Sequence, residues 1–423
     1  MSLTWVFDLG TTYLKAVAFS AAGETRCVCR RPTPWQQSDS GRVEMPADAF
    51  RGTLVELVAE GRQRLGESFA QIDRVSFATQ ANTFTLLDES GEPVVPWISW
   101  TDRRAEDHPL PRIEDYAVTG VPAVSANLSA AKLVWLRAHR PKVWSRARRV
   151  AYLSDELTRW LTGGHVAAAD VAGLTGLFDI HSHRWRRDVL RDLGLDAVRW
   201  PEPMRPGTSL GALQDRSADE IGLPRGAVFH VGCLDQYAAG YAAALPTAGG
   251  VCETTGTVLA TVTAADAFVP SLQAAGIYQG PASTSGYFRM KFGHVSANLL
   301  AAYRQNHAAD LDYTRLDLLA ADPHDPGPHG RAVRDIYERV AEALQSQIEA
   351  LRPQPAPTHL TCLGGGARSP LWKSIKSRRL GLPCRSLPTD EPTAWGVVRL
   401  IDRVGRGVAE PPARDFKASG EAD

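Results

Sequence analysis

The pattern of apolar and polar positions predicts strands and helices in alternation along the first part of the chain. Residues 46–65 place apolar side chains at helical spacing, with Phe50, Leu54 and Leu57 on one stripe. Alternation of strands with such a helix indicates an α/β layer architecture. The strands expected around this helix cover residues 4–9, 14–20, 26–32, 74–79 and 83–88.

The turn between the first two strands has a composition that suits phosphate binding. Backbone N–H groups and hydroxyls of such a hairpin bind phosphate oxygens, and a carboxylate beside it can hold Mg²⁺. The turn lacks the G-x-x-x-x-G-K-[ST] pattern, so it is not a P-loop. Taken alone, a structural turn is the simpler explanation, because glycine tolerates φ > 0. The residues concerned are Asp8, Gly10, Thr11, Thr12 and Lys15.

The same strand–turn–strand pattern appears again in the second half of the chain. A hairpin with threonines follows the apolar residues that begin at 251, and a run of glycines follows the strand expected from 358. Together these features predict a nucleotide site, with the two hairpins on the phosphates and the glycines close to the base. The residues concerned are Thr255, Gly256 and Thr257 in the hairpin and Gly364, Gly365 and Gly366 in the glycine run.

Asp235 ends an apolar strand expected over residues 228–235, and a helix of small residues follows it. A carboxylate at the end of a buried strand can face a cleft and accept the proton of a hydroxyl during phosphoryl transfer. The competing interpretation is a helix N-cap, a position that favours Asp. Both interpretations stay open on the local sequence.

Aromatic and polar side chains also gather at two strand ends. Trp100 and Asp102 follow one apolar segment, and Gln80, Asn82 and Thr83 follow another. An indole packs against the C–H groups of a polyol while carboxylates and amides bind its hydroxyls, so these residues form a candidate sugar pocket. The alternative is a polar turn after an edge strand.

Composition excludes several classes of protein. Lys plus Arg number 47 and so do Asp plus Glu, so no net field favours nucleic acid or an anionic membrane. No apolar run is long enough to span a bilayer and no signal-peptide pattern is present, so we expect a cytoplasmic protein without a membrane partner. We expect the cysteines to be free thiols. They are Cys27, Cys29, Cys233, Cys252, Cys362 and Cys384.

The length of 423 residues allows two or three domains. Residues 246–250, with a proline and two glycines, are the best candidate for a boundary. We therefore expect an N-terminal domain over residues 1–245, a C-terminal domain over residues 246–408 and a polar tail over residues 409–423. Within the second domain a long helix is expected over residues 332–351.

In their order and spacing these motifs resemble those of the FGGY family of carbohydrate kinases, which includes xylulokinase, fuculokinase and glycerol kinase. Five segments carry the resemblance, and they span nearly the whole chain. They are FDLGTTYLKAV over residues 7–17, the segment 87–105 with its W-T-D-R-R, GCLDQ over 232–236, TGT over 255–257 and LGGGARSPLW over 363–372.

The resemblance implies two ribonuclease-H-like domains, of the actin and hexokinase type, flanking a central cleft for ATP and sugar. It implies transfer of the γ-phosphate of ATP to a hydroxyl of a ketose, deoxyketose or polyol. Asp235 would be the general base, Asp8 would organise Mg²⁺, and a homodimer is one candidate assembly. The sugar pocket would be shaped by Gln80, Asn82, Thr83, Trp100, Asp102 and Gln236.

The chain also departs from the family pattern. It is shorter than usual, and a Gly-Glu-Arg-x-Pro segment is absent before the long helix. Gln-Ala-Asn-Thr over residues 80–83 replaces the Gln-Met-His-Gly of xylulokinases, and Ser377 and Arg378 replace an Ala-Asp pair. Two alternatives therefore stay open beside the kinase. One is a non-catalytic relative that binds sugar or nucleotide, and the other is a phosphohydrolase of the same superfamily.

Overall fold

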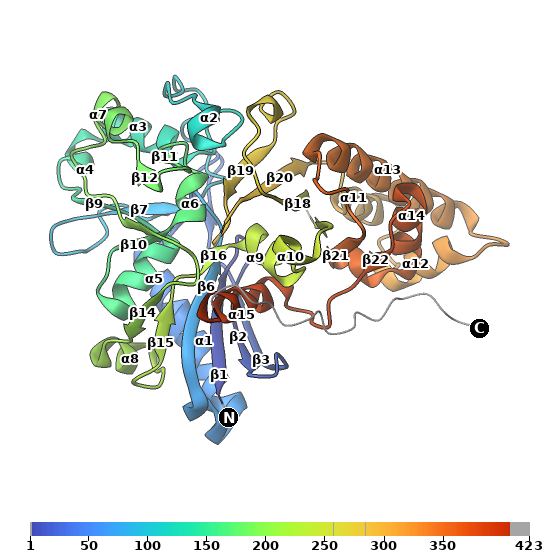
Figure 1. Cartoon of the computed structure of the whole chain (residues 1–423), viewed down its shortest axis with the longest axis horizontal. Coiled ribbons are helices and arrows are strands. Elements are labelled where there is room, and N and C mark those ends of the chain that lie inside the picture. The colour runs from blue at the N-terminus through green and yellow to red at the C-terminus, as the bar shows by residue number, and fades with distance from the viewer. Residues whose placement is uncertain (1, 257, 284, 407–423) are drawn as a thin grey trace. The chain divides into compact units, whose positions relative to one another are not determined.

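The computed structural model describes residues 2–256, 258–283 and 285–406. The chain forms two compact units, each built on its own β-sheet (Figure 1). Unit 1 holds the chain up to Ala238, residues 279–285 and the stretch from Thr393, and unit 2 holds the segments between them. The division falls inside helix α9 (Asp235–Ala242), a few residues before the expected boundary at 245/246.

The central sheet of unit 1 begins with the expected hairpin. The first strand is buried along its whole length and pairs antiparallel with the second, so that Asp8 faces Lys15 across the ladder. A strand buried on both faces needs helices on both sides. The order is β14-β15-β6-β1-β2-β3, and β16 also pairs with β6. The bounds are β1 Leu3–Leu9, β2 Tyr13–Ser20, β3 Thr25–Pro32, β6 Ile72–Thr79, β14 Ser209–Ala212, β15 Val228–His230 and β16 Cys233–Leu234.

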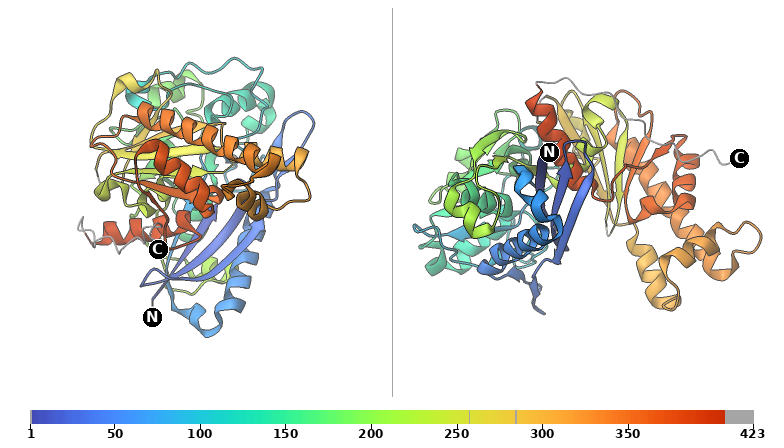
Figure 2. Two further views of the ribbon diagram at one scale, coloured as in Figure 1. Left: turned by 90° about the vertical axis from the view of Figure 1, so that its right-hand side faces the viewer. Right: turned by 90° about the horizontal axis from the view of Figure 1, so that it is seen from below.

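Helices cover both faces of this sheet. Helix α1 (Ala47–Leu65) packs on β2 and β3 (Figure 2). The apolar stripe predicted for this helix is buried. At the crossing with β1, Gly61 leaves room for an indole, since a Cβ there would lie 2.2 Å from the Trp5 ring. On the opposite face the ring of Trp395, on α15 (Pro392–Gly405), lies 5.6 Å from that of Phe19.

The remaining part of unit 1 contains a second sheet, two short strand pairs and several short helices. The second sheet has the order β4-β5-β8-β7-β9. Its strands are β4 Gln36–Gln37, β5 Val43–Met45, β8 Trp97–Ile98, β7 Phe84–Leu87 and β9 Arg149–Tyr152. The two short pairs are β10 Val166–Ala168 with β13 Glu202–Met204, and β11 Phe178–Asp179 with β12 Arg184–Trp185. The helices are η1 Gly66–Gln71, α2 Tyr116–Thr119, α3 Ser129–His139, α4 Pro141–Trp144, α5 Leu153–Thr162, α6 Ala169–Gly173, α7 Arg187–Asp192 and α8 Asp215–Ile221.

The strand expected over residues 228–235 is interrupted in the structure. It forms β15 and β16, which both pair with β6, and Gly232 lies between them. A Cβ at Gly232 would lie 1.7 Å from the carbonyl oxygen of Phe77, so only glycine allows this close approach to β6. This close approach to β6 brings the residues that follow Gly232 to the end of the sheet.

Unit 2 contains the second expected hairpin at the centre of its sheet. Strands β20, β18, β17, β21 and β22 lie side by side in that order. Strand β17 is antiparallel to β18 and parallel to β21. The bounds are β17 Val251–Thr255, β18 Leu259–Ala265, β20 Tyr287–Gly293, β21 Leu360–Gly364 and β22 Cys384–Arg385; β19 (Tyr278–Pro281) carries the chain back toward unit 1.

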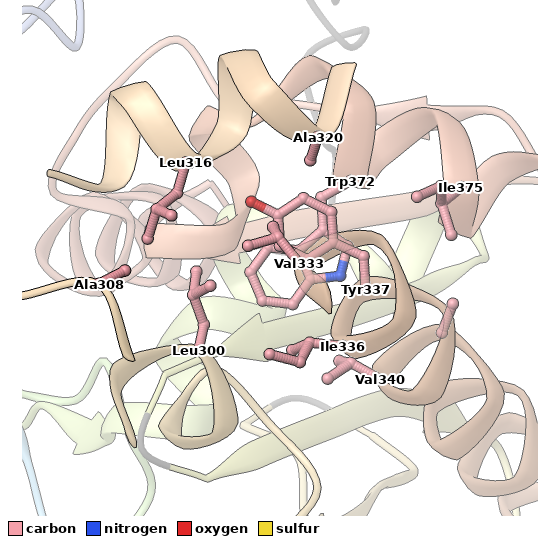
Figure 3. Packing of buried hydrophobic residues seen from close by; sticks show 11 residues of the cluster. Leu300, Ala308, Leu316, Ala320, Val333, Ile336, Tyr337, Val340, Trp372 and Ile375 are labelled. Atoms are coloured by element: carbon pink, nitrogen blue, oxygen red, sulfur yellow. The ribbon is translucent and has the colours of Figure 1, made fainter. Parts of the chain in front are cut away.

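The long helix of unit 2 begins earlier than expected. Helix α13 runs over Gly327–Leu351 rather than from residue 332, because Pro328 is tolerated in the first turn of a helix. One side packs on the sheet, and near its start Tyr337 stacks on Trp372 in an apolar cluster (Figure 3). The other helices of unit 2 are α10 Leu245–Ala248, η2 Pro270–Leu272, α11 Asn298–His307, α12 Tyr313–Ala321, η3 Gly365–Arg368 and α14 Pro370–Leu380.

All six cysteines are free, and Cys27 and Cys29 share one face of β3, with sulfur atoms 3.6 Å apart. None of the helices in the described part of the chain has both the length and the apolar character that a bilayer crossing requires.

Candidate functional site

The first hairpin holds a carboxylate and an ammonium group at the mouth of the turn. The Asp8 carboxylate lies 3.5 Å from Lys15 Nζ, and both side chains are largely buried. Gly10 is required because a Cβ there would lie 2.8 Å from the Tyr13 carbonyl oxygen. Thr12 is exposed at the tip of the turn. The hairpin therefore presents the Thr12 hydroxyl, the Lys15 ammonium group and the Asp8 carboxylate within a few residues.

Thr11 joins this hairpin to the candidate sugar pocket. Its hydroxyl accepts a hydrogen bond from Trp100 Nε1 at 2.9 Å and donates to Gln80 Oε1 at 3.2 Å. Thr83 donates to the same Gln80 oxygen at 2.9 Å and accepts from the Trp100 backbone N–H at 3.1 Å. Four of the predicted residues thus form one closed hydrogen-bonded ring.

Lys132 supports that ring from behind and was missed in the sequence. It is fully buried on α3, and its Nζ donates to the carbonyl oxygens of Trp100 and Asn127, both at 2.8 Å. Burial lowers the pKa of Lys132 to about 7. A lone lysine in the apolar stretch 130–136 was the available sequence signal, since lysine is almost never fully buried without partners.

The Asn82 side chain is used within unit 1. Asn82 has a left-handed backbone with φ of 61°, which asparagine tolerates better than most residues. Its Oδ1 accepts two hydrogen bonds from Ser129, and its Nδ2 donates to the Leu174 carbonyl oxygen. In this structure the amide connects the end of β6 to α3.

Asp102 is fully buried and paired with Arg104. The Arg104 side chain and backbone N–H donate to its carboxylate at 2.7–3.0 Å, and the Val43 N–H donates at 2.7 Å. Burial acts to raise the pKa of Asp102, but these donors and the guanidinium charge outweigh it, so that the pKa falls below its ordinary value. Here the carboxylate holds the loop that carries Trp100.

Asp235 stands at the start of α9, directly after β16. Because β1, β6 and β16 are parallel neighbours, the register places Asp8, Gln80 and Asp235 at the same end of the sheet. Burial, followed by the nearby carboxylates of Asp8 and Asp170, raises the pKa of Asp235 to about 7. Its Oδ1 accepts the N–H of Gln236 at 2.7 Å. The carboxyl group is thus poised to change protonation near neutral pH.

Asp170 lies behind Asp235 and was also missed in the sequence. It is buried at the start of α6, and its two oxygens accept the backbone N–H groups of Leu234 at 3.0 Å and of Val171 at 2.8 Å. Burial raises the pKa of Asp170 to about 7. An acid inside the alanine-rich segment 167–172 was the available signal.

The second hairpin and the glycine run lie together in unit 2. The Thr255 side chain is fully buried, and a Cβ at Gly366 would lie 3.0 Å from its Cβ. Gly364 and Gly365 are exposed, and Gly364 has φ of 75°, which favours glycine. The Gly256 carbonyl oxygen accepts a hydrogen bond from Ser296. Thr257 lies outside the described residues.

Comparison with protein families identifies the family of the chain. Residues 3–241 match the model of the N-terminal domain of the FGGY family of carbohydrate kinases, which is more than half of the chain. The chain belongs to the FGGY family. This membership places it among the ATP-dependent kinases that phosphorylate carbohydrates.

Curated relatives agree with the FGGY match. L-fuculokinase of Escherichia coli K12 is 23% identical in an alignment 443 positions long, gaps included, that covers 92% of this chain and 90% of that protein. Xylulose kinase of Lactococcus lactis is 26% identical over 242 residues, and glycerol kinase of Rhodospirillum centenum is 32% identical over 233. These two matches cover 55% and 51% of this chain, and the chain spans about half the length of each of these two relatives, 47% in both cases.

Solved structures of FGGY kinases share the fold. A xylulose kinase from Brucella ovis has a TM-score of 0.84 and 21% identity, covering 96% of this chain and 91% of that one. Glycerol kinase of Plasmodium falciparum with ADP has a TM-score of 0.81 and 16% identity, covering 97% and 91%. The predicted α/β class with ribonuclease-H-like domains is confirmed.

Proposed function

We propose that this protein transfers the γ-phosphate of ATP to a hydroxyl of a ketose, deoxyketose or polyol, with Asp235 as the general base. The observation that carries the proposal is the grouping of Asp8, Gln80 and Asp235 at one end of three parallel strands, together with the raised pKa of Asp235. A base is most effective when its pKa lies near the working pH. Asp235 meets that condition.

The donor atoms near the first hairpin fit a magnesium ion held mainly by the nucleotide. Within the described residues no group of three or more His, Cys, Asp or Glu side chains is placed to hold a metal by itself. Mg²⁺ commonly binds through one or two carboxylates, waters and substrate phosphates. Asp8 supplies such a carboxylate, and Lys15 and Thr12 would contact phosphate oxygens beside it. Bound Mg²⁺ would neutralise charge on those oxygens.

Gln236 is the best-prepared side chain for the sugar. Among the described residues its buried Oε1 is one of few side-chain oxygens without a hydrogen-bond partner. An unpaired buried acceptor costs free energy, which a sugar hydroxyl would recover by donating to it. Trp100 would cover the C–H face of the sugar, with its indole N–H bonded to Thr11 and its backbone N–H to Thr83, and Gln80 accepts from both threonines. For Asn82 and Asp102 we propose a supporting role in the same pocket, since their polar atoms are already paired.

The direct test is ADP release from ATP and Mg²⁺ in the presence of a panel of ketoses, deoxyketoses and polyols. We expect at least one sugar to stimulate release. Asp235→Asn should then lower turnover by ~10²–10⁴-fold, the usual contribution of a general base, while the Kd for ATP stays within about twofold. Glu67→Gln, an exposed carboxylate on η1, is the matched control and should behave as wild type.

Three outcomes would contradict the proposal, each in a different way. Intact ATP binding with no sugar-stimulated release across the panel would indicate a binding protein of the kinase fold. ADP release that no sugar changes would indicate a phosphohydrolase. Survival of sugar-dependent turnover in Asp235→Asn would leave Asp235 as a helix cap and remove it from the chemistry.

A further inference from the structure

Unit 2 contains a fully buried ion pair directly beneath the second hairpin. Lys376 on α14 and Glu253 on β17 both have no exposed side-chain surface, and Lys376 Nζ lies 2.5 Å from Glu253 Oε1. A buried charge is tolerated only when it is paired and its hydrogen-bonding groups are satisfied. The position of this ion pair, between the second hairpin and the helix that follows the glycine run, therefore requires an explanation.

The pair forms a closed ring with Thr255. Lys376 Nζ donates to Thr255 Oγ1 at 2.9 Å as well as to Glu253 Oε1, and Thr255 Oγ1 donates to Glu253 Oε2. The remaining side of the ammonium group faces the Trp372 ring, 5.1 Å from its centroid, as a cation–π contact. Each polar atom of the ring has a partner within unit 2.

This ring changes what Thr255 is able to do. Its only hydroxyl proton is given to Glu253, and the side chain has no exposed surface, so it does not offer a donor to a phosphate oxygen. Its carbon atoms instead face the glycine run. A Cβ on Gly366 would lie 3.0 Å from Thr255 Cβ and 3.1 Å from Thr255 Cγ2. Thr255, the last residue of β17, therefore fixes the distance between this end of the hairpin and the glycine run.

The same ring is connected to the start of α14. Trp372 and Tyr337, both labelled in Figure 3, stack on one another. Their ring centroids are 4.2 Å apart and their planes make an angle of 9°. The Trp372 backbone N–H donates to the Ser369 hydroxyl, which caps the helix and donates to Asp317, and Tyr337 OH also donates to Asp317. The helix that carries Lys376 is thus fixed immediately after the glycine run.

We infer that Glu253 and Lys376 are positioning residues for the nucleotide, which act by holding Thr255 as a spacer between the second hairpin and the glycine run. The inference rests on the proposed function, because it takes these two segments to be the nucleotide-binding part of unit 2. It goes further by giving Thr255 a shaping role in place of a phosphate contact through its hydroxyl. The ion pair then acts through Thr255 and never touches the substrate.

If the ion pair only stabilised the fold, a variant that keeps its stability would bind ATP as wild type does. A double substitution separates this role from the positioning role. Replacing both members of a buried ion pair by apolar residues of similar size is often neutral for stability, whereas removing one partner is strongly destabilising. Glu253→Met/Lys376→Met should therefore fold with a Tm close to wild type but release Thr255. Arg378→Met is the matched control, since Arg378 lies on the same helix in an exposed ion pair with Glu338.

The readouts are the Kd for ATP by calorimetry and the KM values for ATP and for the preferred sugar. For the double variant we expect the Kd and KM for ATP to rise at least about tenfold, because a glycine run no longer held at a fixed distance from the hairpin makes weaker contacts with the nucleotide, and tenfold corresponds to about 1.4 kcal/mol of binding free energy. The sugar KM and the kcat at saturating ATP should stay within about twofold of wild type. Arg378→Met should leave all of them unchanged.

Thr255→Ser provides a second test that does not depend on the double variant. Serine keeps the hydroxyl and removes Cγ2, which faces Gly366. A spacer role predicts weaker ATP binding by severalfold, whereas a phosphate-binding hydroxyl predicts no change. Unchanged ATP affinity in Thr255→Ser or in a folded double variant overturns the inference. Because ATP affinity is measured directly, a wild type that binds ATP without sugar-stimulated turnover would refute the proposed function and leave this test valid.

Discussion

At the scale of single residues, the surroundings of Asp235 determine how its carboxyl group responds to pH. The group has little contact with water, and the carboxylates of Asp8 and Asp170 add negative charge near it, so its protonated form is favoured. No cation pairs with it in the described contacts of unit 1, in contrast to Asp102 beside Arg104. Two aspartates of unit 1 therefore have opposite pKa shifts.

The raised pKa of Asp235 predicts a pH-dependent stability difference. In the unfolded chain an aspartate loses its proton near pH 4, while in the folded protein Asp235 keeps it up to about pH 7. Ionisation therefore favours the unfolded state increasingly between pH 4 and 7, and the cost is constant above pH 7. Without ligands, Asp235→Asn should melt at least about 2 °C above wild type at pH 8, the shift given by ~1 kcal/mol in a large domain.

The same variant should show little or no gain at pH 4.5, where wild-type Asp235 is protonated in the folded state and hydrogen-bonds much as asparagine does. Thermal melts in one buffer series from pH 4.5 to pH 8.5 check this. A difference that is constant with pH would mean that the carboxyl group is not desolvated as the structure indicates.

At the scale of elements, local patterns predicted the hairpins and long-range contacts determined how their residues are used. Strands over 4–9 and 14–20 and the helix over 46–65 follow from periodicity, and the structure confirms them. Asp102 and Thr255 each have one partner close in sequence, but Asp102 also accepts from Val43, 59 residues away, and Thr255 from Lys376, 121 residues away, and no local pattern reveals these distant partners. The break between β15 and β16 likewise depends on Phe77, a residue of a different strand.

That break gives a prediction about Gly232. A Cβ 1.7 Å from the Phe77 carbonyl oxygen forces β16 away from β6, and Asp235 moves with it. Gly232→Ala should therefore lower the Tm clearly and reduce sugar-dependent turnover by about 10²-fold, since small displacements of a catalytic group have effects of this size. Thermal melting and the ADP-release assay measure the two effects.

Gly52→Ala is the matched control for this substitution. Gly52 lies within α1 with no atom near its missing Cβ, so alanine should raise stability by about 0.5–1 kcal/mol and leave turnover unchanged. A Gly232→Ala protein with full turnover would show that β16 can leave β6 without disturbing Asp235.

At the scale of the whole molecule, the candidate residues divide between two units that each have their own core. The sugar-pocket residues and Asp235 belong to unit 1, and the glycine run and second hairpin belong to unit 2. A ligand that binds only the folded state raises its stability by RT ln(1 + [L]/Kd), about 2.7 kcal/mol at a hundredfold excess over Kd. Ligand-induced Tm shifts therefore report the binding of sugar and the binding of ATP separately.

Two substitutions, one in each unit, should lose different Tm shifts. Gln236→Met replaces a side chain whose Oε1 has no partner, so the unliganded Tm should not fall, but the shift caused by the preferred sugar should shrink strongly while that of ATP persists. Gly366→Ala places a Cβ 3.0 Å from Thr255 and should reduce the ATP shift while the sugar shift persists. If either substitution abolished both shifts, the assignment of Gln236 to the sugar and of Gly366 to ATP would have to be abandoned.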